Sequence, residues 1–400
     1  MNHDISMNTL VKLTQEMIRT PSVSGDEEGV VSVLRRFFQN RGITDLVQDE
    51  YGSLIATMKG DKEGPVLLFD GHVDTVPVPD PQAWQYPPFE GIIQDGRLYG
   101  RGASDMKGAV AAMAVAAASF LEKTKGHFHG SLVIAGVVME EIFEGVAARA
   151  ISRRSQPDVV VIGEASELKL KIGQRGRAEI AVETLGVPAH SANPEKGYNA
   201  VYLMTEIIQA IRNQKPPTHP VLGEGILELT DIKSAPYPGA SVVPSYCKAT
   251  YDRRLLPGEE KEGVLAPVIE AIQGISEKDK RASAKAAYAQ GRERCYTGTM
   301  IEAERFFPGW LFDESEWFIK KATKALREAG LSSDLSHYNF CTNGSHYAGE
   351  KNIPTIGFGP SCESLAHTID EYIELKELEG AARGYLALME SFLTSLMLTK

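Results

Sequence analysis

The chain has 400 residues, of which 43% are hydrophobic and 24% are charged, so it is long enough to form two globular domains. Its 53 acidic and 42 basic residues give a net charge of −11, which argues against nucleic acid and anionic membranes as partners. The four cysteines form no C-x-x-C pair, so reduced cysteines in a cytoplasmic protein are the simpler interpretation. Residues 1–5 show no secretory signal pattern, and the longest apolar run, 109–118, is too short to span a membrane.

Residues 1–175 alternate between helical spacing of apolar residues and continuous apolar runs. Continuous runs are typical of strands that are covered on both faces. In chain order, the predicted elements are helices at 6–19 and 24–39, a strand at 66–69, a helix at 105–123, a strand at 132–138, a helix running through residue 149, and a strand at 159–162. This order predicts an α/β fold with an open, mixed but mostly parallel sheet and helices on both faces.

From about residue 176 the pattern changes to half-exposed strands. The predicted elements there are a strand at 178–183, a helix at 199–212, strands near 226–232 and 246–252, and a helix at 259–273. Their order predicts an inserted two-layer, ferredoxin-like α/β domain at 176–300. A helix at 314–329 and a strand at 354–357 then return the chain to the first domain, which comprises 1–175 and 301–400.

Five short segments each end in a residue type that binds metal ions. They are Gly71-His72-Val73-Asp74, Ser104-Asp105-Met106, Met139-Glu140-Glu141, Ile162-Gly163-Glu164 and Ala366-His367. Four of them follow or lie beside a predicted strand, and ligands of open α/β sheets bind beyond the carboxyl ends of the strands. Histidines together with carboxylates suit a pair of divalent ions, and zinc accepts both ligand types. The pattern therefore predicts a two-metal hydrolase.

Taken singly, these segments have simpler interpretations. His72 could be an ordinary turn histidine; as a metal ligand, it could be held through its second ring nitrogen by Asp74. Asp105 stands at the start of a predicted helix, where an aspartate is often an N-cap. Glu140 and Glu141 are harder to explain without a cation, because two adjacent carboxylates follow an apolar strand.

The motifs resemble the signatures of the co-catalytic di-zinc family that contains acetylornithine deacetylase, succinyl-diaminopimelate desuccinylase, aminoacylase and glutamate carboxypeptidase. The matching segments are 71–77, 100–108, 139–141 and 366–372, together with the spacing to Glu164. Within that family, the chain is most similar to the hydrolases linked to selenium metabolism. The resemblance covers nearly the whole chain and implies a phosphorylase/hydrolase-like catalytic domain with an inserted lid and dimerisation domain.

The resemblance also implies a ligand set. One metal ion would be held by His72 and Glu164, and a second by Glu141 and His367. Asp105 would bridge the two ions. Zinc is the expected metal, and cobalt is expected to substitute for it.

Further roles near the metals follow from the same resemblance. Glu140 would be the general base, taking a proton from the attacking water and returning it to the leaving amine. A cis peptide is implied between Asp105 and Met106.

Outside the metal ligands, three segments also resemble the family. His190 would cross the interface of a homodimer and donate to the oxyanion in the partner's active site, although a surface-loop histidine is the alternative. Arg254, or its neighbour Arg253, would grip a substrate carboxylate, with a structural salt bridge as the alternative. Asn343 and Gly344 lie where the family has a glycine-rich substrate loop.

The leading hypothesis is a zinc-dependent amidohydrolase that acts on a small N-acyl amino acid or dipeptide-like substrate with a free carboxylate. Glu rather than Asp at position 164 goes with carboxypeptidases and deacylases in the wider family. Two alternatives stay open: an aminopeptidase or dipeptidase with a similar metal site, and a metal-binding module without catalysis. The presence of Glu140 and Asp105 argues against the second of these.

Overall fold

The computed structural model describes residues 5–279 and 281–394, so residues 1–4, where no signal pattern was expected, lie outside the described part. The chain forms two compact units. The first comprises Met1–Gln174, Arg292–Glu302 and Leu311–Lys400, and the second comprises Arg175–Gly291 and Ala303–Trp310. For comparison, the sequence analysis placed the first domain at 1–175 and 301–400 and the second at 176–300.

The first unit is built on one large mixed sheet. Its strand order is β1 (Leu46–Gln48), β2 (Leu54–Lys59), β6 (His129–Val137), β3 (Lys62–His72), β7 (Val159–Ile162), β20 (Thr355–Gly357), β8 (Leu170–Gln174) and β18 (Trp310–Leu311), with β19 (Leu335–Tyr338) beside β8. The central strand β3 is parallel to β6 on one side and to β7 on the other. β7 is in turn parallel to β20, whereas β1, β2 and the β20–β8 pair are antiparallel. The expected mixed, largely parallel sheet is confirmed.

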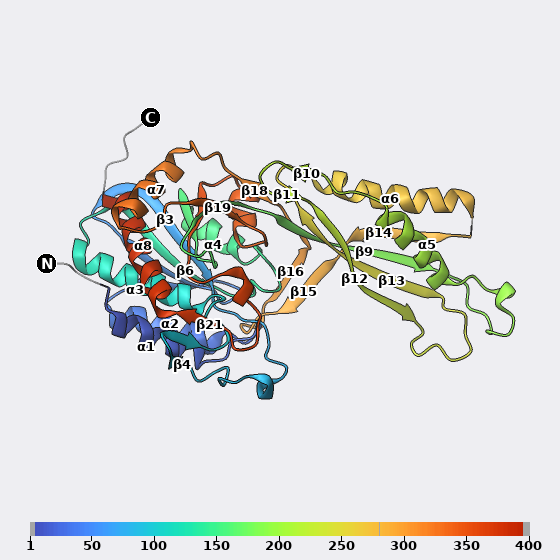
Figure 1. Ribbon diagram of the computed structural model, residues 1–400, viewed down its shortest axis with the longest axis horizontal. Helices are drawn as coiled ribbons and strands as arrows, with labels where there is room; N and C mark the ends of the chain where they lie inside the picture. The colour runs from blue at the N-terminus through green and yellow to red at the C-terminus, as the bar shows by residue number, and fades with distance from the viewer. Residues whose placement is uncertain (1–4, 280, 395–400) are drawn as a thin grey trace. The chain divides into compact units, whose positions relative to one another are not determined.

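Helices of the first unit cover this sheet. They are α1 (Met7–Ile18), α2 (Glu28–Asn40), α3 (Lys107–Thr124), α4 (Ala148–Ser155), α7 (Trp317–Glu328) and α8 (Leu375–Thr394). Figure 1 shows α8, near the end of the chain, beside α3 in the first unit. The Phe69 ring of β3 contacts Tyr385 of α8, whereas the next residue, Asp70, bonds Tyr347. Because successive residues of a strand face opposite sides, both faces of β3 are covered.

Close packing explains two features of the sequence near β3. Gly71 lies where an added Cβ would be 2.8 Å from the Val110 side chain, so only glycine lets α3 approach the strand this closely. The second feature is the alanine content of α3, a helix that is buried on nearly all sides.

Within the described residues, neither α3 nor any other helix has the length and apolarity needed to cross a membrane.

The structure has a helix at residue 149 between β6 and β7, as expected. This helix, α4, begins at Ala148, and residues 138–147 form turns. A small three-stranded sheet of β4 (Ile92–Gln94), β5 (Arg97–Tyr99) and β21 (Tyr372–Glu374) lies elsewhere in the first unit. The hairpin β15 (Gln290–Arg294) and β16 (Met300–Glu304) lies mostly in the first unit, and residues 303–310 then belong to the second unit again.

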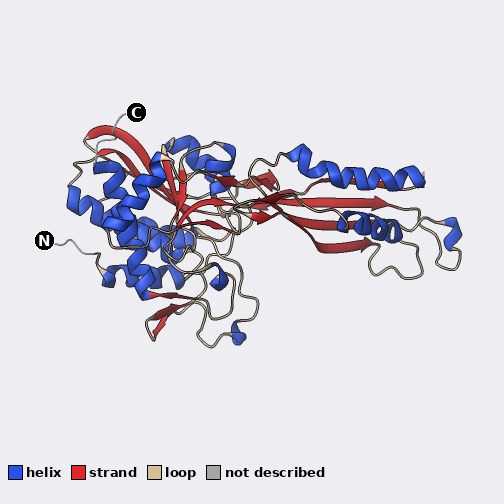
Figure 2. Ribbon diagram, turned by 45° about the horizontal axis from the view of Figure 1, so that its top comes forward, coloured by secondary structure: helices blue, strands red, loops and turns tan. Residues whose placement is uncertain are grey.

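The second unit is a two-layer α/β structure. Its sheet has the order β12 (Ile226–Ala235), β13 (Tyr246–Leu255), β9 (Gly176–Leu185) and β14 (Ser283–Tyr288), with β17 (Phe306–Phe307) also beside β9. α5 (Ala200–Arg212) and α6 (Lys261–Lys278) bury their apolar sides against this sheet, and Figure 2 shows both running along its strands. Apart from the short pair β10 (Thr218–His219) and β11 (Gly223–Glu224), the chain follows the expected β-α-β-β-α-β order.

Candidate metal centre

The ends of three adjacent parallel strands carry most of the predicted ligands. His72 is the last residue of β3 and lies opposite Val137, the last residue of β6. Glu140 and Glu141 follow β6 by three and four residues, and Glu164 follows β7 by two. Since β6 and β7 flank β3, their carboxyl ends bring these side chains to one edge of the sheet.

Loops supply the other two predicted ligands. Asp105 precedes α3, and its peptide bond to Met106 is cis, as the family resemblance implied. The helix starts after Met106, and no side chain caps it, so Asp105 is not an N-cap. His367 follows a short 3₁₀ helix, Glu363–Leu365.

Asp105 joins the two histidines through different oxygens. Its Oδ1 lies 2.9 Å from His72 Nε2, and its Oδ2 lies 3.2 Å from His367 Nε2. Each histidine also has a glutamate of its own. Glu164 Oε1 is 3.4 Å from His72 Nε2, and Glu141 Oε2 is 2.9 Å from His367 Nε2. The side chains therefore form two donor groups that share one carboxylate.

The electrostatics of this cluster favour cations. Burial, opposed in part by the neighbouring histidines, raises the pKa of Glu164, and burial together with the Asp105 charge raises the pKa of Glu141 to about 7. Hydrogen bonds to Asp105 and Glu141 raise the pKa of His367 to about 10. Burial alone would lower the pKa of His72, but the surrounding carboxylates, Glu164 first, raise it well above its usual range. A field that stabilises imidazolium in this way also stabilises a divalent ion.

Glu140 points into the same cluster. It is 5% exposed, and its Oε1 has no hydrogen-bond partner among the described residues. Ligand atoms of His72, Glu140 and Glu164 lie within 4.8 Å of one another, as do those of His72, Asp105 and Glu141. Burial and the nearby carboxylates raise the pKa of Glu140 well above the usual value for a glutamate. An ionisable oxygen without a partner beside two metal-type donor groups suits a proton acceptor.

Asp74 supports the centre through different atoms from those expected. His72 Nδ1 is bonded to the backbone carbonyl oxygen of Asp74 at 2.9 Å, whereas the carboxylate Oδ1 is 3.7 Å away. The carboxylate instead accepts the backbone N–H groups of Glu140 and Glu141, each at 3.1 Å, and the hydroxyl of Ser24. One residue thus orients both His72 and the loop that carries the two glutamates.

Two supporting carboxylates were not predicted from the sequence. Glu371, fully buried, accepts bonds from Arg101 Nη1 and from the backbone N–H groups of Gly102, Ser104 and Asp105. Glu27, also fully buried, accepts the backbone N–H of Met139. Glu371 lies inside the segment that resembles the family, which was a signal for it. Glu27 had none, because its partner is more than a hundred residues away in sequence.

His190 lies in the second unit on an exposed loop. Its Nδ1 accepts the backbone N–H of Ala192 at 3.0 Å. In the neutral imidazole this bond leaves the proton on Nε2, so Nε2 is a hydrogen-bond donor.

The two arginines near the end of β13 face opposite sides of the sheet of the second unit. Arg253 is 4% exposed and is paired with Glu259. Arg254 is more exposed, and its Nε donates a hydrogen bond to Asp252 Oδ1 at 2.7 Å. Arg253 thus forms its ion pair within the second unit, whereas the terminal nitrogens of Arg254 make no hydrogen bond within the described residues.

Asn343 and Gly344 lie in the first unit, but the Asn343 side chain is used within the fold. Its Nδ2 donates to Asp70 Oδ1 at 2.8 Å, and its Oδ1 accepts the backbone N–H of Gly145 at 2.8 Å. Asn343 is only 2% exposed. Both ends of the amide are thus bonded within the first unit, and a contact of Asn343 with substrate stays a prediction. The backbone N–H of Gly344 is likewise bonded to the Thr342 hydroxyl.

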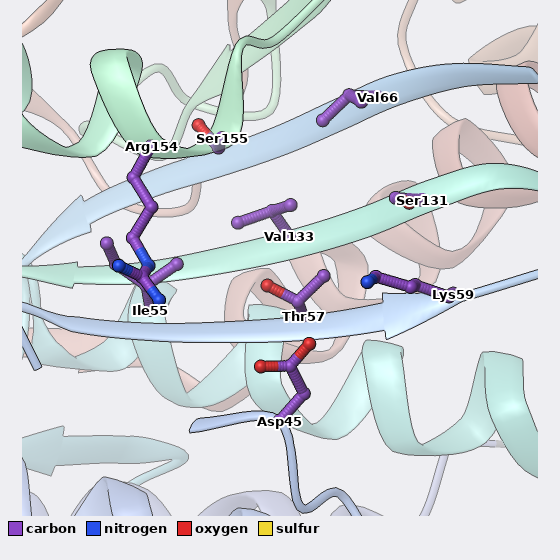
Figure 3. Close-up of a pocket in the computed structure, with 9 residues that line it drawn as sticks. All are labelled: Asp45, Ile55, Thr57, Lys59, Val66, Ser131, Val133, Arg154 and Ser155. Atoms are coloured by element: carbon purple, nitrogen blue, oxygen red, sulfur yellow. The ribbon is translucent and has the colours of Figure 1, made fainter. Parts of the chain in front are cut away.

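A cavity of about 410 Å³ lies elsewhere in the first unit (Figure 3). Side chains of β2, β3, β6 and α4 line it, including Thr57, Val133 and Arg154. Its lining holds one carboxylate, Asp45, and no histidine. It therefore offers no metal-type donor set.

Known proteins resemble the chain over nearly its full length. A family model described as Peptidase family M20/M25/M40 matches residues 68–391. The Escherichia coli K12 protein YgeY, described as uncharacterized, is 30% identical over 96% of this chain and 95% of its own length. Succinyl-diaminopimelate desuccinylase 2 of Ruegeria sp. TM1040 is 27% identical over 96% of this chain and 95% of its own. The crystal structure of aminopeptidase PepT from Bacillus cereus shares the fold, with a TM-score of 0.74, 21% identity, and coverage of 97% of this chain and 99% of its own.

Proposed function

Because this chain belongs to peptidase family M20/M25/M40 and is a metal-dependent amide hydrolase, we propose that it cleaves small N-acyl amino acids or dipeptide-like molecules with two divalent ions. One observation carries the proposal: the two oxygens of Asp105 reach different histidines, each of which has its own glutamate. This is the donor arrangement of a pair of ions bridged by one carboxylate. The name of the Ruegeria relative, a desuccinylase, supports an N-acyl amino acid as the substrate class.

The residues present fit such a pair. His72 and Glu164 would hold one ion, Glu141 and His367 the other, and Asp105 both. Nitrogen and carboxylate donors suit zinc, and cobalt accepts the same set. Bound there, two divalent ions would acidify a shared water and polarise the scissile carbonyl.

Metal binding can be tested without a substrate. Zn²⁺ added to the metal-free protein is expected to raise Tm, since an ion at a hundred times its Kd stabilises the folded state by about 2.7 kcal/mol. Asp105→Ala is expected to remove most of this rise, because it takes a ligand from both ions at once. Asp61→Ala is the matched control: Asp61 pairs with an exposed histidine, His127, and directly precedes β3, at the opposite end of that strand from His72. An undiminished rise in the Asp105 variant, measured by calorimetry with metal analysis, would contradict the shared-ligand assignment.

In the proposed reaction, Glu140 is the general base. It takes the proton of the attacking water and later delivers it to the leaving amine nitrogen. The Oε1 of this buried carboxyl, which has no hydrogen-bond partner in the part of the chain that the structure describes, is the atom suited to this exchange. Asp74, through the two backbone N–H groups that it accepts, holds Glu140 and Glu141 in their relative positions.

His190 is proposed to act on the active site of a partner subunit in a homodimer. The Nε2–H that it presents is a suitable donor to the oxyanion of the tetrahedral intermediate. Support for a dimer through the second unit comes from β12, which ends the strand order of its sheet and exposes Ile226 and Ile232. An edge strand has unpaired backbone groups with which a second copy can pair.

Arg254 is proposed to grip a free carboxylate of the substrate. The Arg254 side chain is 29% exposed, against 5% for Arg253, and within the described residues its terminal nitrogens make no hydrogen bond, which supports this choice. A guanidinium can bind a carboxylate through two parallel hydrogen bonds, and it supplies a cation in a protein with a net charge of −11.

Substrate and enzyme variants together test the carboxylate contact. Converting the substrate carboxylate to an amide is expected to lower kcat/KM by about ten- to a hundredfold, as is Arg254→Ala with the acid substrate. With the amide substrate, Arg254→Ala is expected to have almost no effect, because the contact is already lost. Arg281→Ala, which removes an exposed arginine paired with Asp279 in the same unit, serves as the control. Equal activity on acid and amide, or preference for a free α-amine, would favour an aminopeptidase instead.

A further inference from the structure

Three consecutive backbone N–H groups in the loop after β6 point at two buried carboxylates. The N–H of Met139 donates to Glu27 Oε1 at 3.1 Å. The next two, of Glu140 and Glu141, donate to Asp74. The loop that carries the proposed base and one proposed ligand is therefore held by its main chain, through two acceptors from other parts of the chain.

The backbone of this loop needs such acceptors. Met139 has a φ of +61°, in the left-handed region that residues with a Cβ rarely adopt. Conformations of this kind persist where the surroundings overdetermine them. The bond from Met139 to Glu27 is formed at the strained residue itself, one position before Glu140.

Glu27 is itself held in place from several directions. Its Oε1 also accepts the N–H of Gly25 at 2.9 Å. The preceding residues are joined to the segment after His72, because Ser22 donates to the carbonyl oxygen of Val73 at 2.6 Å and accepts the N–H of Thr75 at 2.9 Å. The acceptor for Met139 thus belongs to a segment that is also bonded beside His72.

We propose that Glu27 is a positioning residue for catalysis, which directs Glu140 and Glu141 into the metal centre by holding the N–H of Met139. The proposal rests on the function proposed above, in which Glu140 is the base. Glu27 itself touches neither substrate nor metal. Its loss is expected to misplace the base, and a displacement of about 1 Å can lower the rate about a hundredfold.

The position of the Glu27 acceptor matters more than its charge. Oε1 makes both bonds to backbone N–H groups, whereas Oε2 is buried without a partner among the described residues. Burial and the nearby Asp74 carboxylate raise the pKa of Glu27 to about 7, so loss of the charge also removes a repulsion. Glutamine keeps the acceptor at the same reach, while aspartate keeps the charge but withdraws the acceptor by one methylene.

The two conservative variants therefore make opposite predictions. Glu27→Asp is expected to lower kcat about 10–100-fold with little change in KM and with both metals bound, the range typical of supporting residues around a metal site. Glu27→Gln is expected to stay within about threefold of the wild-type kcat, because its side-chain oxygen can still hold the N–H of Met139. Asp49→Asn is the matched control: Asp49 is a half-buried carboxylate that accepts three backbone N–H groups of its own turn.

Hydrogen exchange provides a measurement that does not depend on activity. In the metal-free protein, the amides of 139–141 are expected to exchange faster in Glu27→Asp and at the wild-type rate in Glu27→Gln and Asp49→Asn. Wild-type exchange and wild-type kcat in Glu27→Asp, or equal loss in both Glu27 variants, would overturn the proposal. Faster exchange in Glu27→Asp with an active Glu140→Ala enzyme would instead support the positioning contact and contradict the role of Glu140.

Discussion

Replacement of Glu140 by alanine is expected to lower kcat by about 10²–10⁴-fold while both metal ions stay bound. Glu140 is not one of the proposed metal ligands, and its Oε1 has no partner among the described residues. The substitution removes the group that takes and returns the proton, but it leaves Asp105 and the two histidines in place. The measurement is kcat with an N-acyl amino acid that the wild-type enzyme cleaves, together with the metal content of the same sample.

Glu350→Ala is a suitable control for the Glu140 variant. Glu350 is a partly buried carboxylate of the same unit that pairs with Arg149 and His346. Its removal is expected to affect stability rather than kcat. A Glu140→Ala enzyme with full metal content and near-normal kcat would rule out Glu140 as the base.

His190→Ala is expected to lower kcat by about 10²–10³-fold, the effect of removing one donor to an oxyanion. The loss should fall on kcat without release of metal, because the proposed contact forms in the transition state. His219 offers a closely matched control in the same unit, since its Nδ1 likewise accepts backbone N–H groups, those of Val221 and Leu222. His219→Ala is expected to retain the wild-type kcat.

Mixing two inactive variants distinguishes a histidine of the partner from one of the same subunit. If His190 serves the partner, a dimer of one His190→Ala chain and one Glu140→Ala chain contains one complete active site. Co-refolding the two variants should therefore restore activity that neither has alone. If confirmed mixed dimers regain no activity, or if a monomer is fully active, the proposed role of His190 in the partner's active site is contradicted.

The sequence by itself determined the edge of the sheet at which the centre forms. Apolar runs revealed the strands before His72, Glu140 and Glu164, and carboxyl ends of neighbouring parallel strands meet at one edge. The proximity of these side chains could be expected because each residue is close in sequence to the strand that positions it. The family motifs added Asp105 and His367, whose approach across 262 positions no local pattern could indicate.

Packing between distant segments decided what the local patterns could not. The sequence analysis did not predict α8, which contains Gly380 and Gly384, residues that disfavour a helix. There, Leu168 and Phe358 approach so closely that a Cβ would collide with them, so tertiary contacts outweigh helix propensity. The hydrogen bonds of the Asn343 amide to Asp70 and Gly145 also join segments far apart in the sequence, so no local pattern could predict them.

Atom-level roles in the centre likewise depend on the tertiary structure. The sequence indicated that Asp74 supports His72, but only the fold shows that its carbonyl oxygen does so. Its carboxylate is thereby left for the N–H groups of the next loop. Glu27 looks like an ordinary residue at a helix start until β6 brings Met139 to it. Sequence patterns show which residues end a strand, whereas the bonds made by buried carboxylates depend on donors that only folding brings together.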